Sequence, residues 1–356
     1  MPADPAIWIQ ALFVTLLGLA FGSFTNTVIY RVPRFQSVVA PRSRCPHCGI
    51  EIQLRDNVPI ISFLALKGRC RTCQWRIPLQ YPFVELFTAT LFLASYATFG
   101  PSIRLIPVSA FVCVVVALSV IDLHHRLLPD VITYPAFVLS FFAAAMGWAL
   151  EAETVPPTDP AHPMIWTATL IGLSGLVLWV IDWIDIQLVA KRLECDAEES
   201  PEEPARAWLT PATVGLSALC AALYLIWAGL LASGREPGAH WADLERVKGA
   251  YLGATVAGGI IWAMRIIYFL VRREEGTGFG DVKMMMFVGG FLGWRFGFST
   301  ILLASVLGSV AGLAAIIKSR DRSIKIPFGI FLGAGALISL FLGAQLLGWY
   351  FSRWAE

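Results

Sequence analysis

Long apolar stretches alternate with short polar ones along this chain of 356 residues. The apolar runs lie at about residues 6–29, 83–99, 104–121, 131–149, 164–188, 208–233, 249–271, 282–294, 297–317 and 327–350. Most of them have close to the roughly 20 residues that a helix needs to cross a bilayer, and the run at 282–294 is shorter. The pattern predicts an all-α polytopic membrane protein with about ten membrane helices, one of them short. A content of 57% hydrophobic and 15% charged residues agrees with this class.

The charged residues predict the orientation of the chain. The first run has no Lys or Arg before it, unlike a secretory signal peptide, and Arg31 and Arg34 follow it. The only long polar stretch, residues 31–81, holds nine of the 27 Lys and Arg residues. Placing this stretch in the cytoplasm and alternating sides also puts most of the other positive charges there, as the positive-inside rule requires. The net charge of +2 is too small to indicate a nucleic-acid partner.

Four of the seven cysteines form two CxxC pairs, Cys45-Pro-His-Cys48 and Cys70-Arg-Thr-Cys73. This spacing lets two thiolates of each pair reach one tetrahedral ion, and a polar segment of about fifty residues needs such a staple to stay folded. We therefore expect residues 31–81 to form a small cytoplasmic zinc-binding domain. A redox dithiol pair or a chance pattern is the less favoured alternative. His47 is expected to face solvent within its turn, and the other three cysteines have no partner in the pattern.

The stretch Gly278-Phe279-Gly280-Asp281 places a carboxylate at a membrane boundary, where an acid is costly and usually functional. The two glycines are expected to interrupt the helix and let this loop approach another segment closely. A short motif of this kind also fits a solvated turn between helices. The functional interpretation therefore needs a second acid at the same membrane face.

Asp122 is the candidate for that second acid, since it ends the predicted helix 104–121 on the side where Asp281 is expected. Two carboxylates at close range cannot both ionise easily, so one stays protonated while the other carries the charge. An aspartic protease uses such a pair: the ionised acid takes a proton from water and the protonated acid polarises the scissile carbonyl. Asp130 is the alternative to Asp122, although its position after Pro129 favours a helix N-cap for 131–149.

At this point the chain resembles the type 4 prepilin peptidases (prepilin leader peptidase and N-methyltransferase), which are intramembrane aspartic proteases of the GxGD class. The matching blocks occur in family order and include Gly22-Ser23-Phe24, Val28 to Pro33, Arg42-Ser43 with the four cysteines, Asn57-Val58-Pro59, Tyr81-Pro82 with Glu85, Asp122 with Leu128 to Asp130, Gly278 to Asp281 with Lys283, and Ile326 to Gly329. The resemblance implies a catalytic pair of Asp122 and Asp281 and a Zn²⁺ site of Cys45, Cys48, Cys70 and Cys73. Gly278, Gly280, Lys283, Asp130 and Glu85 would be supporting residues.

By the same resemblance, the protein cleaves the basic leader from type 4 prepilins or type II secretion pseudopilins and then methylates the new N-terminus with S-adenosylmethionine. Its setting would be the bacterial inner membrane, with the zinc domain and both aspartates on the cytoplasmic side. No sequence feature assigns the cofactor pocket, because there is no glycine-rich dinucleotide-type loop.

The expected domains are a first transmembrane helix at 1–30, the zinc-binding domain at 31–81 and a protease core at 82–356, with residues 1–100 as the methyltransferase part. An extra helical pair with an acidic loop within 150–248 departs from the usual eight spans of the family and is a candidate for binding pilus or secretion assembly components. Two other hypotheses remain. A transporter would need acids near the middle of the bilayer and repeated halves, and a non-enzymatic assembly factor would use the zinc domain for docking alone.

Overall fold

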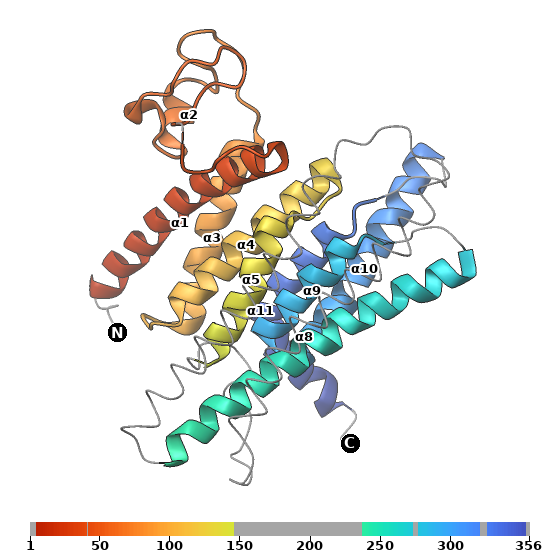
Figure 1. Cartoon of the computed structure of the whole chain (residues 1–356). Coiled ribbons are helices and arrows are strands. Elements are labelled where there is room, and N and C mark those ends of the chain that lie inside the picture. Colours follow the sequence, from red (N-terminus) through yellow and green to blue (C-terminus); the bar gives the residue numbers. More distant parts are fainter. Residues whose placement is uncertain (1–4, 41, 146–236, 273–276, 321–325, 354–356) are drawn as a thin grey trace.

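The computed structural model describes residues 5–40, 42–145, 237–272, 277–320 and 326–353. The described part of the chain is almost entirely helical and forms a membrane bundle with a small polar lobe at one end (Figure 1). Its long helices are α1 (Pro5–Arg31), α3 (Gln80–Phe99), α4 (Leu105–His125), α5 (Asp130–Ala145), α8 (Pro237–Arg272), α9 (Phe279–Leu292), α10 (Trp294–Ser319) and α11 (Gly329–Ser352).

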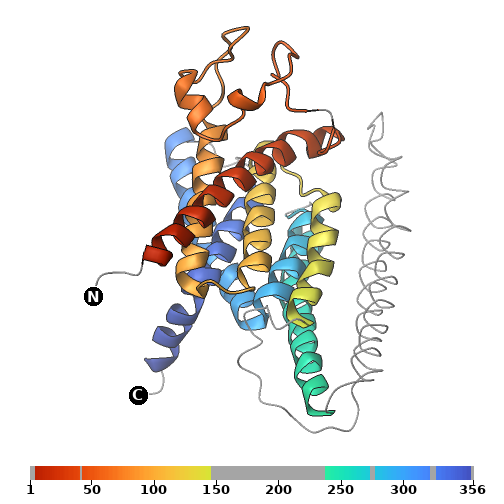
Figure 2. The same ribbon diagram turned by 90° about the vertical axis from the view of Figure 1, so that its left-hand side faces the viewer.

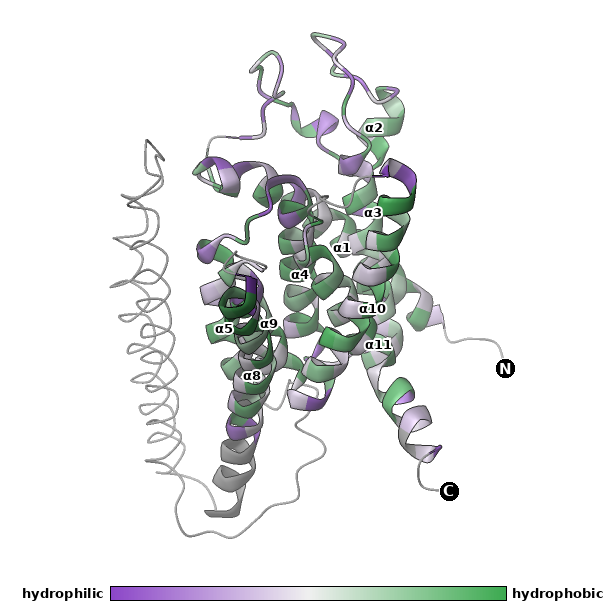
Figure 3. Cartoon of the chain, turned by 90° about the vertical axis from the view of Figure 1, so that its right-hand side faces the viewer, coloured by the Kyte–Doolittle hydropathy of each residue, from purple (hydrophilic) through white to green (hydrophobic). Residues whose placement is uncertain are grey.

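Six of the described helices are long and apolar enough to cross a membrane: α1, α3, α4, α8, α10 and α11. Helix α5 is apolar but shorter, and α9 has only 14 residues. Figure 3 shows apolar residues along the bundle and polar ones concentrated in the lobe. The predicted runs 164–188 and 208–233 lie outside the described residues, so the structure supports a multi-pass helical protein without testing the predicted number of about ten helices.

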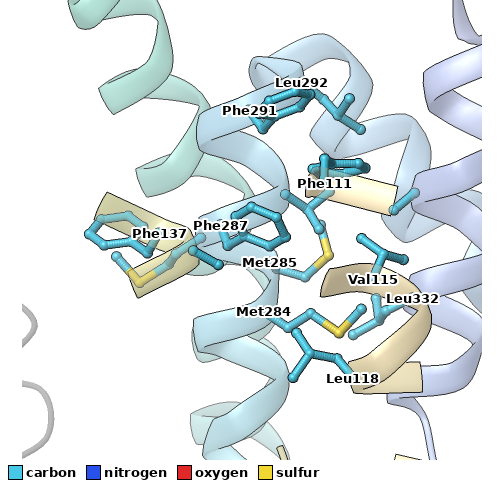
Figure 4. Packing of buried hydrophobic residues seen from close by; sticks show 14 of the residues in the cluster. Phe111, Val115, Leu118, Phe137, Met284, Met285, Phe287, Phe291, Leu292 and Leu332 are labelled. Atoms are coloured by element: carbon cyan, nitrogen blue, oxygen red, sulfur yellow. The ribbon is translucent and has the colours of Figure 1, made fainter. Parts of the chain in front are cut away.

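Helix α9 forms the centre of the bundle. Every residue from Asp281 to Leu292 is buried. Helix α9 contacts α5, α8, α10 and α11, and its Phe287 and Phe291 rings contact Phe111 of α4. Figure 4 shows Met284 and Met285 packed against Leu118 of α4 and Leu332 of α11. Burial from all sides explains why the run at 282–294 is apolar on every face apart from Lys283.

Glycines bring two helix pairs into backbone contact. A Cβ added to Gly253 of α8 would meet the carbonyl oxygen of Gly289 of α9, and the reverse also holds. In α1, a Cβ on Gly18 would lie 2.6 Å from the Cα of Ala89, and one on Gly22 would lie 2.7 Å from the Cα of Glu85. Small residues at these crossings allow the close approach on which packing within a membrane depends.

The lobe comprises the segment between α1 and α3 and includes the short helices η1 (Val32–Arg34), η2 (Leu54–Asp56) and α2 (Ile61–Ala65). It lies over the adjoining ends of α1 and α3 (Figure 2). Its two cysteine turns have the same backbone design: Cys45 and Cys70 donate their N–H groups to the carbonyl oxygens of Ile50 and Trp75, both at 2.9 Å.

Three predicted boundaries are wrong. Helix α4 continues beyond Asp122 to His125 and ends where Arg126 adopts a left-handed conformation and donates its N–H to the Asp122 carbonyl. Helix α8 begins at Pro237, twelve residues before the predicted run at 249. Helix α9 begins at Phe279, so Asp281 lies in a helical turn and not in a loop. In all three cases polar residues are part of the helix, and hydropathy alone places the boundary at the apolar residues.

Candidate active site of two buried aspartates

Asp122 lies one turn before the end of α4 and is only 6% exposed. It faces the N-terminus of α11, where the backbone N–H groups of Gly329 and Ile330 stabilise the negative charge of its carboxylate by hydrogen bonding. A Cβ added to Gly329 would lie 2.7 Å from Asp122 Oδ2. Within the described residues this buried oxygen has no hydrogen-bond partner. Asp122 therefore presents one carboxylate oxygen that a water molecule or a substrate can use.

Asp281 lies in the first turn of α9 and is also 6% exposed. The Asp122 carboxylate interacts electrostatically with the Asp281 carboxylate, so the two acids form an interacting pair. Arg265 of α8 also acts on Asp281 and is itself buried. Two buried acids from helices far apart in sequence are thus close enough to interact electrostatically.

Two contacts join α9 to the turn that follows Asp122. A Cβ on Gly280 would lie 2.7 Å from the Cβ of Leu128, so the absence of a side chain lets the first turn of α9 rest against this turn. One helical turn further, Lys283 Nζ lies 3.0 Å from Asp130 Oδ1. These contacts flank Asp281 in the sequence and hold it opposite Asp122.

The supporting glycines have unequal roles. Gly280 makes the close approach that was expected of both, whereas a Cβ on Gly278 would meet only the backbone nitrogen of Gly280, at an ordinary van der Waals distance of 3.9 Å. Gly278 is the N-cap of α9 with φ of −70°, a value that any residue adopts. The expectation of a close approach by Gly278 is therefore wrong for the described contacts.

Asp130 is the first residue of α5, in agreement with its expected position at a helix start. Its carboxylate is occupied by Lys283, whose ammonium also lies 4.7 Å from the ring centroids of both Tyr134 and Phe279. A paired and partly exposed Asp130 differs from Asp122, whose buried oxygen is free within the described part of the chain. This geometry favours Asp122 as the partner of Asp281.

The four paired cysteines form a second candidate site. The ligand atoms of Cys45, Cys48, Cys70 and Cys73 all lie within 4.8 Å of one another, and Cys45 Sγ is 3.8 Å from Cys73 Sγ. Tetrahedral coordination with metal–sulfur bonds of about 2.3 Å requires sulfur atoms about 3.8 Å apart. Backbone N–H groups of Cys73 and Thr72 lower the pKa of the Cys70 thiol to about 7, which favours the thiolate that a metal binds. The residues present therefore fit a tetrahedral metal ion.

His47 is exposed and stacks on Trp75, with 6.2 Å between ring centroids. It does not belong to the cluster of ligand atoms, so its predicted place in a solvent-facing turn is confirmed. Cys113 packs partly buried against the core, as expected of an incidental cysteine. Cys195 and Cys220 lie outside the described residues.

Glu85 links the lobe to α3. It is 8% exposed, and its Oε2 accepts a hydrogen bond of 2.8 Å from the N–H of Ile60. Ile60 has φ of 61°, which is strained for a β-branched residue. The N–H of Ile61 donates to the Pro59 carbonyl at 2.6 Å, which closes a three-residue γ-turn around Ile60. Glu85 therefore anchors a strained turn of the lobe to the membrane bundle.

Two family models match most of the chain. Residues 16–99 match the bacterial peptidase A24 N-terminal domain, and residues 109–188 and 218–313 match the type IV leader peptidase family. The chain belongs to the type IV leader peptidase family. The gap in this family's match, 189–217, contains the whole acidic loop at 191–206. No solved structure matches the chain at a significant level.

Two of the following three relatives of this peptidase family member match nearly all of its length. A prepilin leader peptidase/N-methyltransferase of Burkholderia pseudomallei is 26% identical over 94% of this chain and 86% of its own. A prepilin leader peptidase/N-methyltransferase of Aeromonas hydrophila is 26% identical over 97% of this chain and 95% of its own. One of Myxococcus xanthus is 45% identical over 40% of this chain and 42% of its own.

Sequence reasoning missed three residues of the site. Arg265 interrupts the apolar run 249–271, and a single charge in a membrane span is a signal that could have identified it. Gly329 belongs to a recognised sequence block, but its contact with Asp122 depends on the packing of α11 against α4. Leu128 likewise contacts Gly280 only because α9 packs beside the α4–α5 turn, so its place in the site depends on this packing.

Proposed function

We propose that this protein cleaves the leader peptide from prepilins or pseudopilins and then N-methylates the new N-terminus. The observation that carries the proposal is the meeting of Asp122 and Asp281, two buried acids from separate helices, in a member of a leader peptidase family. A substrate that is itself a membrane helix can present the junction before that helix to acids at the same membrane face. No observation favours an assembly factor without activity.

Asp122 is proposed as the general base. The N-terminus of α11 stabilises negative charge on this carboxylate, and its unpartnered oxygen can accept a proton from the attacking water. Asp281 is proposed as the protonated acid that donates a hydrogen bond to the scissile carbonyl. As the water oxygen bonds to the carbonyl carbon, its proton passes to Asp122; a proton is then delivered to the leaving nitrogen as the C–N bond breaks.

Lys283, Asp130 and Arg265 are proposed to position this pair without acting on the substrate. The ion pair holds α9 against α5, and Arg265 offsets part of the negative charge that builds up between the two acids. Gly329 contributes by leaving space where a Cβ would meet the Asp122 carboxylate, and Gly280 contributes by letting α9 rest against Leu128. Gly278 begins the helix that carries Asp281.

The four cysteines are proposed to hold Zn²⁺, since thiolate ligands in tetrahedral geometry favour this ion. Two CxxC turns of matching backbone design support a structural role, because all four ligands are used and no coordination position stays open for catalysis. The ion would keep the lobe folded over α1 and α3. S-adenosylmethionine is the proposed methyl donor for the second activity.

We place the protein in the bacterial inner membrane, with the lobe and both aspartates in or next to the cytoplasm. The concentration of Lys and Arg on this side supports the orientation. Residues 1–100 are proposed as the methyltransferase part and 82–356 as the protease core. The acidic segment within 150–248, which lies outside the described residues, is proposed to contact pilus or secretion assembly components.

The deciding experiment measures leader cleavage by the purified protein in detergent, using a prepilin from the same cell and mass spectrometry of the product. Asp122→Asn and Asp281→Asn should each lower the rate by at least about 100-fold, which is the scale of lost general acid–base catalysis. Asp130→Asn tests the alternative acid and should lower the rate by no more than about tenfold, because Asp130 positions the pair without acting on the substrate. Cleavage that survives Asp122→Asn but is lost in Asp130→Asn would reverse the assignment of the pair.

A further inference from the structure

A cavity of about 680 Å³ lies between the lobe and the adjoining ends of α1 and α3. Its size is within the range of pockets that bind small molecules and cofactors. Neither Asp122 nor Asp281 lines it, so it is separate from the site of peptide cleavage. Figure 1 shows that the lobe and the turn between α4 and α5 nevertheless occupy the same end of the bundle.

The walls of this cavity combine three kinds of side chain. They supply aromatic faces, carboxylates and a guanidinium group, from Tyr30, Trp75, Glu51, Glu85 and Arg44. A sulfonium nucleoside that carries an amino acid needs an apolar or aromatic surface for its purine, carboxylates for its hydroxyl and cationic groups, and a cation for its own carboxylate. The chemistry of the lining fits such a ligand.

Asn26 of α1 has a buried side-chain oxygen without a hydrogen-bond donor among the described residues. It is 3% exposed and lines the cavity. Its Nδ2 donates a 2.9 Å hydrogen bond to the Tyr81 carbonyl, which fixes the orientation of the amide. Its buried Oδ1 accepts no hydrogen bond from any described residue. Because a buried polar atom without a partner is costly, this oxygen is suited to accept a hydrogen bond from a ligand.

The wall beside Asn26 is held in one shape before any ligand binds. Ile60 lines the cavity in its left-handed conformation, and Glu85 holds the N–H of Ile60 at 2.8 Å. Strain of this kind persists only where the surrounding structure enforces it, and it is typical of binding sites. Glu85 is therefore a positioning residue for the cavity.

We propose that this cavity binds the methyl donor S-adenosylmethionine, with Asn26 Oδ1 accepting a hydrogen bond from an N–H or O–H group of the donor. This inference rests on the proposed N-methylation. When bound, the donor supplies a methyl group to the amine nitrogen, so that an N–C bond forms while the S–C bond breaks and leaves its electron pair on sulfur. The residues of the cavity bind and orient the donor and exclude water around it.

The rim of the cavity also interacts with the end of α4. Arg34 lies 4.1 Å from the ring centroid of Tyr30, which lines the cavity. Arg34 also acts electrostatically on His125, three residues after Asp122 at the end of α4. The rim of the cavity and the end of α4 therefore lie close enough to interact electrostatically.

The test measures binding of S-adenosylmethionine to the full-length protein in detergent by isothermal titration calorimetry. Ala40 lines the cavity and is exposed, so Ala40→Trp should fill part of the space and weaken binding at least tenfold. Val39 is 88% exposed and does not line the cavity, which makes Val39→Trp the matched control with unchanged binding. Asn26→Ala should weaken binding roughly five- to tenfold, the effect of one lost hydrogen bond.

A second measurement separates this proposal from the function on which it rests. Methylation of a synthetic peptide with an already mature N-terminus should fall in Ala40→Trp and persist in Asp281→Asn, while leader cleavage shows the opposite pattern. Wild-type binding that neither Ala40→Trp nor Asn26→Ala weakens would overturn the cavity as the donor site and leave N-methylation intact. A wild-type protein that neither binds the donor nor methylates the peptide would instead refute the proposed N-methylation.

Discussion

Lys283 of α9 forms a 3.0 Å ion pair with Asp130 of α5, between residues 153 positions apart in the chain. The Lys283 side chain is 8% exposed and the Asp130 side chain 28%. The pair therefore ties the helix that carries Asp281 to the turn that follows Asp122, at a position largely shielded from water.

Replacement of Lys283 by Met should destabilise the bundle and lower cleavage. The change leaves Asp130 without its partner, and we expect a loss of about 2 kcal/mol, below the value for a fully buried pair because water still reaches Asp130. A double-mutant cycle with Asp130→Asn, read by thermal unfolding in detergent, measures the coupling. Additive effects of the two changes would show that the ion pair does not join the helices.

Replacement of Gly329 by Ala should impair cleavage without unfolding the protein. The added Cβ would lie 2.7 Å from Asp122 Oδ2, so the carboxylate must shift from its present position. Gly348 provides the control in the same helix, because a Cβ there meets no atom within 4 Å. We expect at least a tenfold loss of cleavage rate for Gly329→Ala and wild-type rates for Gly348→Ala. Equal rates in both variants would contradict the proposed contact.

Metal analysis should find one Zn²⁺ for each chain. Cys45→Ser removes a thiolate from the first cysteine turn and Cys70→Ser removes one from the second, so each variant should release the ion. Cys113→Ser should retain the ion, because Cys113 packs against the bundle core. Elemental analysis by mass spectrometry gives the ratio directly. Loss of the ion should also increase proteolytic cleavage within 42–76, since the lobe has little apolar core of its own. A metal content that is unchanged in both Ser variants would refute the site.

The Asp56–Arg71 pair should remain intact in mildly acidic solution. Arg71 binds both carboxylate oxygens of Asp56, at 2.7 and 2.8 Å, and this hydrogen bonding lowers the pKa of Asp56 below its usual 3.8. The pair therefore contributes fully to the stability of the fold at a pH above the pKa that Asp56 has in the unfolded chain. This contribution is lost only as the pH falls through the lowered pKa of the folded state. A carboxyl NMR titration should show a midpoint below 3.8 that returns to the usual range in Arg71→Gln.

Local sequence features predicted the chemistry better than the packing. The spacing of Cys45, Cys48, Cys70 and Cys73 indicated a common ion because each CxxC turn is a local structure, and the polar residue Asp281 was conspicuous between apolar runs. The contacts of Gly280 with Leu128 and of Gly329 with Asp122 join distant parts of the chain, and no local pattern encodes them. The cavity beside Asn26 was equally invisible, because its walls come from α1, α3 and several turns of the lobe.

The short length of α9 has a consequence for the surrounding lipid. With 14 residues it is roughly 21 Å long, whereas the hydrocarbon layer of a bilayer is about 30 Å thick. If the far end of α9 reaches the opposite side of that layer, Asp281 lies below the level of the lipid headgroups, and hydrolytic water must follow the polar side chains of Asp130 and Lys283 to reach it. Turnover should then depend on acyl-chain length, slowing in thick bilayers as the path for water lengthens.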